Sequence, residues 1–200
     1  MKRVTCIVGG VMLFAASSAA QAPSTGQKVN FSTSLQRAYA TLKEQLTQAA
    51  EDMPEAKYRF NPVAQPDLRP VVVKNPGVGN PNRTAESKPS RTYGQLIGHQ
   101  TDNLFNGCAI LKGVPNPSES SEKKAMKATK AELVKAMADA LAFCDGAIAA
   151  LTDQNALQMI KRGEGEAARG AVVAALLSHG HGSASAAAVY LRLNGIARPW

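Results

Sequence analysis

Aromatic residues are scarce in this chain of 200 residues: they make up 5% of it, with a single tryptophan. A core with so few rings must be filled mainly by Ala, Leu, Val and Met, which favours closely packed helices over an aromatic-rich sandwich of sheets. Hydrophobic residues make up 44% and charged residues 19%, as in ordinary globular proteins. The length suffices for one domain with its own core.

Long hydrophobic runs are also missing. The apolar stretch at residues 4–15 is too short to cross a bilayer, which needs about 20 residues, and no other segment could span a membrane. Lys2 and Arg3 precede this stretch and small residues follow it at 17–20, which is the order typical of a secretory signal peptide. We therefore expect cleavage after Ala20 and a mature protein that is periplasmic or secreted.

Acidic residues are outnumbered, with 15 against 23 lysines and arginines, and the formal net charge is +8. Loss of the two basic residues in the signal peptide reduces this to +6. The basic residues are spread along the chain and are not interleaved with aromatics, which argues against nucleic acid as a partner. A solvated basic surface accounts for the excess, with attraction to anionic surfaces as the alternative.

Cysteine is rare as well. One of the three cysteines, Cys6, lies in the predicted signal peptide, which leaves Cys108 and Cys144 in the mature chain. An even number of cysteines in an exported protein indicates a disulfide. Both residues also fall on apolar helix faces, so two buried free thiols are the alternative.

Four segments place apolar residues at three- and four-residue steps, the spacing of amphipathic helices. Their ends carry caps, prolines or glycine, including the capping box Thr129-Lys130-Ala131-Glu132. The first helix should follow Ser32 or Thr33, both good caps, and end at Pro54. The other three are expected at about residues 92–111, from the capping box to about 151, and at about 167–193.

Prolines concentrate between the first two predicted helices: more than half of the chain's 11 prolines lie in residues 61–90. This composition predicts a long irregular loop at 64–90, with a short extended piece at 71–73 as its only regular part. Residues 163–166, Gly-Glu-Gly-Glu, are interpreted as a turn, and no segment carries a convincing hairpin signal.

These features predict an all-α protein, an up-down four-helix bundle with a long loop between its first two helices. The predicted parts are a signal peptide at 1–20, a flexible leader at 21–29 and the bundle at 30–197.

Four stretches, in order along the chain, resemble the DinB-like family of four-helix bundles, and specifically its exported bacterial branch. The resemblance covers about residues 30–197, although the proline-rich insertion and the last four residues depart from it. The matching stretches are residues 53–62, residues 93–99 with Cys108 nine positions later, residues 143–145 followed by 151–153, and residues 190–195.

Members of this family commonly hold a divalent metal, zinc or nickel, with three histidines. The resemblance places His99 at the ligand position of the second helix and His179 at the first position of a His-x-x-x-His pair on the last. The second position of that pair is Ser183, a poor metal ligand. His181 lies nearby, but two residues along a helix turn about 200°, so it should point away from His179.

The apolar stripe of the last predicted helix includes His179, with Ser183 one turn later. We therefore expect His179 to face His99 inside the bundle. Two imidazoles supply only half of a tetrahedral shell, so we expect zinc or nickel to bind weakly or not at all.

The sequence leaves two classes of function. The first is an exported DinB-like protein with a degenerate metal site, which binds a small ligand or a partner without catalysis. The second, implied by the resemblance to thiol-dependent transferases, is a metal-dependent transferase or hydrolase-like enzyme in which the metal activates a thiol. No nucleophile elbow, P-loop or dinucleotide-binding motif is present. The substrate, and the choice between a monomer and a homodimer, are left open.

Overall fold

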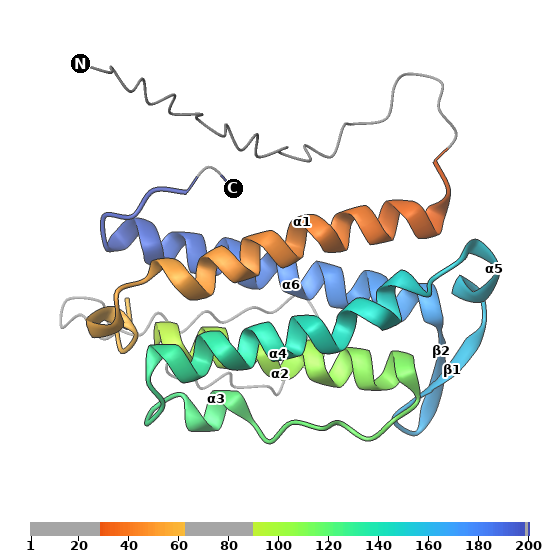
Figure 1. Cartoon of the computed structure of the whole chain (residues 1–200), viewed down its shortest axis with the longest axis horizontal. Helices are drawn as coiled ribbons and strands as arrows, with labels where there is room; N and C mark the ends of the chain where they lie inside the picture. The colour runs from red at the N-terminus through yellow and green to blue at the C-terminus, as the bar shows by residue number, and fades with distance from the viewer. Residues whose placement is uncertain (1–28, 63–89, 199) are drawn as a thin grey trace, which may run out of the picture.

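The computed structural model describes residues 29–62, 90–198 and 200. Four long helices dominate it, and the prediction of an all-α helical bundle is confirmed (Figure 1). They are α1 (Phe31–Asp52), α2 (Tyr93–Lys112), α4 (Lys130–Ala149) and α6 (Arg169–Leu193). The short elements are the 3-10 turn η1 (Glu55–Lys57), α3 (Ser121–Lys124), α5 (Asp153–Ala156) and the strands β1 (Met159–Arg162) and β2 (Gly165–Ala168).

The four long helices form a ring in which α1 and α2 lie on one diagonal, and each of them packs against both α4 and α6 (Figure 1). Contacts between helix ends give the directions. Arg169 at the start of α6 donates to the carbonyl of Leu111 at the end of α2, and Tyr190 near the end of α6 donates to the carbonyl of Arg91, which precedes α2. Helices α2 and α6 are therefore antiparallel.

Helices α2 and α4, in contrast, are parallel, so the predicted alternation of directions along the chain is wrong for this pair. Gly94 near the start of α2 packs against Leu133 near the start of α4, and Phe105 packs against Phe143 further along both. The connection at 113–129 runs back along the bundle before α4 begins (Figure 1). It can do so because an extended chain spans about 3.3 Å per residue, whereas a 20-residue helix such as α2 spans about 30 Å.

Small residues let α6 approach α1 closely. A Cβ atom at Gly180 would clash with Cδ2 of Leu42, a side chain that is fully buried. The interior around this contact is mainly aliphatic, as the scarcity of rings predicted. Its largest fully buried aliphatic side chains are Leu42, Leu46, Met53, Ile97, Leu104, Met137, Ile148, Val173 and Leu191.

Helix starts follow local capping where the sequence offers it. The capping box that begins at Thr129 is present, and Thr92 forms a second one with Gln95 at the start of α2. Helix α1 begins earlier than predicted, because Asn30 is its N-cap residue. Ser32 lies inside the helix, where its hydroxyl donates to Asp153 over 2.7 Å. A contact with α5, distant in sequence, has thus replaced the predicted local cap.

Residues 159–168 form an antiparallel hairpin, which the sequence analysis missed by interpreting 163–166 as a turn alone. The register pairs Met159 with Ala168 and Arg162 with Gly165, and Gly163 adopts a φ of 61° in the turn. These four-residue strands are too short for their pattern to stand out from a loop. Because β2 continues to Ala168, α6 begins two residues later than predicted.

Three sequence predictions lie outside the described residues: the signal peptide at 1–20, most of the leader at 21–29, and the irregular loop at 64–90 with its extended piece at 71–73. Among the helices of the described part, none combines the length and the apolar character that crossing a membrane requires.

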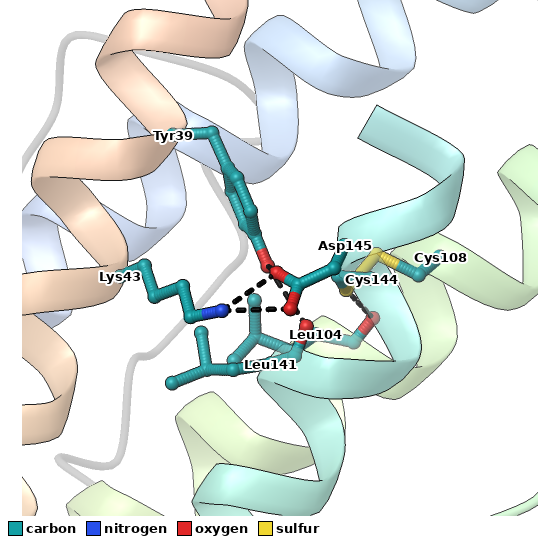
Figure 2. The surroundings of a disulfide bond; sticks show 7 residues. All are labelled: Tyr39, Lys43, Leu104, Cys108, Leu141, Cys144 and Asp145. Atoms are coloured by element: carbon teal, nitrogen blue, oxygen red, sulfur yellow. Dashed lines mark hydrogen bonds and ion pairs between the residues drawn. A yellow bond between two sulfur atoms is a disulfide. The ribbon is translucent and has the colours of Figure 1, made fainter. Parts of the chain in front are cut away.

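The predicted disulfide joins α2 to α4 through Cys108 and Cys144, whose Cα atoms are 5.3 Å apart (Figure 2). Both cysteines are fully buried. Beside the bond, the carboxylate of Asp145 accepts hydrogen bonds from Lys43 and from the Tyr39 hydroxyl, both on α1. Burial, and then the charge of Asp145, raises the pKa of Tyr39. The disulfide and this polar group together connect three of the four long helices.

Candidate functional site

Two histidines from helices distant in sequence meet at the seam between α2 and α6. The capping box of Thr92 begins α2 seven residues before His99, and the antiparallel α6 carries His179 to the same level. The Nε2 atoms of His99 and His179 are 3.1 Å apart, and the ring centroids are 5.1 Å apart. The structure therefore brings together the two histidines that the sequence analysis singled out.

The pair lies nearer the surface than predicted. His179 is exposed, and 28% of the side-chain surface of His99 is accessible. His179 falls at the edge of the buried stripe of α6, beside Leu176 and Ser183, which are both buried. The expectation that the pair lies inside the bundle is corrected on this point: its rings close the outer edge of the α2–α6 seam.

The carboxylate of Glu122, on α3, contacts the Nδ1 atom of His99. Glu122 Oε2 lies 2.8 Å from Nδ1 of His99, and Oε1 accepts a 2.6 Å hydrogen bond from Arg91. Neither Glu122 nor Arg91 was among the site residues predicted from the sequence. Glu122 is 23 residues from His99 on another helix, so no short-range pattern could have linked the two.

Helix α3 is held against α2 by Asp102, one turn after His99. The carboxylate of Asp102 accepts hydrogen bonds from the backbone N–H groups of Ser121 and Glu122, over 2.6 and 3.1 Å. Gly98 allows this close approach, because a Cβ atom there would lie 2.7 Å from the carbonyl group of Ser121. The glycine and the aspartate next to His99 thus position the carboxylate that holds its ring.

The charges around the pair favour neutral imidazole at His179. Partial burial, and then the nearby charges of His99 and Arg91, lower the pKa of His179. Partial burial raises the pKa of Glu122, but hydrogen bonds from Arg91 and His99 outweigh that effect and leave the pKa below its usual value. Both Glu122 and, at 3.3 Å, the Arg91 guanidinium lie against Nδ1 of His99. In the tautomer that donates its Nδ1 proton to Glu122, the lone pair of His99 is on Nε2 and faces His179.

The position at which the family resemblance predicts a third metal-binding histidine holds Ser183, which is no comparable ligand. Ser183, one turn after His179, is 8% exposed and carries only a hydroxyl. His181 points to the opposite side of α6, where its Nδ1 lies 3.0 Å from Oε1 of Gln45 on α1. Within residues 29–62 and 90–198, no three His, Cys, Asp or Glu side chains gather in a way that could hold a metal ion.

Two hollows flank the histidine pair, and both are lined by Asn103 and Asn106 of α2. The first, of about 330 Å³, lies on the His99 side and is polar, with Asp102 and Ser120 among its walls. The second, of about 270 Å³, lies on the His179 side. Because His99, Asn103 and Asn106 are three or four residues apart, they share one face of α2.

The fold and the site define a four-helix bundle with a two-imidazole site between its second and last long helices. The chain matches the family model of the DinB superfamily over residues 38–181 and belongs to that superfamily. The matched range includes both His99 and His179 and ends before Ser183. The chain matches no curated protein.

Proposed function

We propose that this member of the DinB superfamily is an exported binding protein whose histidine pair is a degenerate metal site. The observation that supports this most is the pairing of His99 and His179 across the α2–α6 seam, with Ser183 at the third position. In this proposal the site holds a divalent ion weakly or not at all, and the bundle binds a small ligand without metal-dependent catalysis.

The Nε2 atoms of the two histidines are suited to supply two of the four ligands of a tetrahedral metal ion. Zinc–nitrogen bonds are about 2.0–2.1 Å long, so two imidazole ligands of a tetrahedral ion lie about 3.3 Å apart. The Nε2 atoms of His99 and His179, at 3.1 Å, are close to that separation. A bound zinc or nickel ion would supply a Lewis acid there, but the serine hydroxyl of the third position does not replace an imidazole.

Ser183→His is expected to raise the affinity for zinc at least about tenfold, because it restores a third imidazole at the His-x-x-x-His spacing. The measurement is calorimetric titration of zinc into untagged protein. Ser183→Ala is the matched control and should leave the affinity unchanged. Since position 183 is buried, the thermal midpoint of each variant is measured as well, to separate a lost site from a lost fold.

One outcome would reverse the proposal. If the natural protein binds stoichiometric zinc tightly, and His181→Ala abolishes that binding, then α6 rearranges to bring His181 into the site. The second candidate function, a metal-dependent transferase or hydrolase-like enzyme, would then be preferred. The contact of Glu122 with Nδ1 of His99 favours that candidate, since ligand histidines commonly donate their second N–H to a carboxylate.

Export is the other part of the proposal, and it rests on the charged, apolar and small-residue order of residues 1–20. Protein recovered from the cell envelope or the medium is expected to begin near Gln21. Intact-mass measurement of the natural-source protein checks this, and a mature pool that retains Met1 would contradict it.

A further inference from the structure

The hollow on the His179 side has walls from three elements: α2, α6 and the β1–β2 hairpin. Its volume is about 270 Å³, near the lower limit for small-molecule sites. Apolar side chains of Ile110, Val172 and Leu176 form part of it, and Arg162, Asn103 and Asn106 supply polar groups. No aspartate or glutamate lines this hollow, although its neighbour on the His99 side includes Asp102.

The cation of the hollow comes from the hairpin. Arg162 is the last residue of β1 and is paired in register with Gly165, whereas its neighbour Lys161 is paired with Glu166. Successive side chains of a strand point to opposite faces, so Arg162 and Lys161 face different sides of the hairpin. Arg162 is exposed to solvent at the hollow, and its guanidinium has neither an ion-pair partner nor a hydrogen-bond partner among the described residues.

An unused donor belongs to Asn103 of α2, one of the residues that line the hollow. The Nδ2 atom of Asn103 is buried and has no hydrogen-bond partner among the described residues. A buried amide N–H without an acceptor is unfavourable, so a small rotation of the Asn103 side chain toward a ligand acceptor in the hollow would relieve that cost. Together with Arg162, Asn103 gives the hollow two kinds of donor and no competing carboxylate.

We propose that this hollow binds a small organic carboxylate. Its anionic group would contact the Arg162 guanidinium, whose planar fork matches a carboxylate, and the Asn103 amide. Its apolar part would lie against Ile110, Val172 and Leu176, and His179 is also part of the wall. The volume suits one ring or a short chain. This inference rests on the proposed function, since it assigns the ligand class of the same binding site.

The test uses benzoate as the probe and benzamide, its neutral isostere, as the ligand control. Benzoate added to ¹⁵N-labelled protein is expected to shift the Asn103 side-chain amide and the His179 ring resonances, and benzamide should bind more weakly. Arg162→Gln is expected to weaken benzoate binding about tenfold, through loss of the charge-assisted hydrogen bonds. Lys161→Gln removes the same charge from the adjacent position and should leave the affinity nearly unchanged.

Equal weakening by Arg162→Gln and Lys161→Gln would overturn the proposal, because it would indicate attraction by net charge alone. Shifts that avoid Asn103 and His179, or no binding of benzoate, would also overturn it. Zinc titrations of the same variants keep the two proposals apart: benzoate binding can fail while zinc binding stays weak, as the proposed function expects. Tight zinc binding would contradict the proposed function whatever benzoate does.

Discussion

Reduction of the Cys108–Cys144 disulfide is expected to lower the free energy of unfolding by about 4 kcal/mol. The bond closes a loop with a sequence separation of 36 residues, and opening it returns the conformational entropy of that loop to the unfolded chain. The loop contains the long return connection at 113–129, which is free to sample many conformations once the reduced chain unfolds. For a domain whose total stability is typically 5–15 kcal/mol, this loss is large.

Urea unfolding of the protein with and without a reductant measures this difference. Alkylation followed by mass measurement confirms that both thiols are free in the reduced sample. A variant with both cysteines replaced by alanine is the control, and its unfolding curve should not respond to the reductant. A midpoint for the natural protein that is the same before and after verified reduction would contradict the expectation.

Gly98→Ala is expected to lower the free energy of unfolding by about 2–3 kcal/mol, because a methyl group has no room at this position. The new Cβ would lie 2.7 Å from the Ser121 carbonyl group and 2.8 Å from the Glu122 backbone nitrogen. Backbone atoms of α3 cannot turn aside as a flexible side chain does. Helix α3 must shift as a unit, which weakens its hydrogen bonds to Asp102 and moves Glu122 away from His99.

Gly146→Ala is the matched control, since it makes the same change in α4, where a Cβ atom would meet nothing within 4 Å in the described structure. It is expected to raise stability by about 0.5–1 kcal/mol, the usual gain for alanine over glycine within a helix. Urea unfolding compares the two variants, and the ¹⁵N resonances of the His99 ring report whether Glu122 has moved. Equal stability of the two variants would show that α3 is not packed as described.

Much of the histidine site could be predicted from the sequence, because its two main residues lie on recognisable helices. The pairing of His99 with His179, and the opposite direction of His181, followed from helix positions and from the family resemblance. Glu122, Arg91 and Arg162 could not be predicted in this way. They reach the site from a short helix, a loop and a hairpin, whose placement depends on packing and not on a local pattern.

The sequence by itself determined the four long helices and the capping box at Thr129, and it favoured a Cys108–Cys144 disulfide over two free thiols. These depend on spacings of three or four residues, or on there being two cysteines in the expected mature chain. Only the tertiary structure decided the parallel course of α2 and α4, the hairpin and the exposure of His179. All three features depend on contacts between segments that are far apart in the sequence. The local spacing of apolar residues is compatible with several helix arrangements, and close contacts such as that of Gly98 with α3 select one of them.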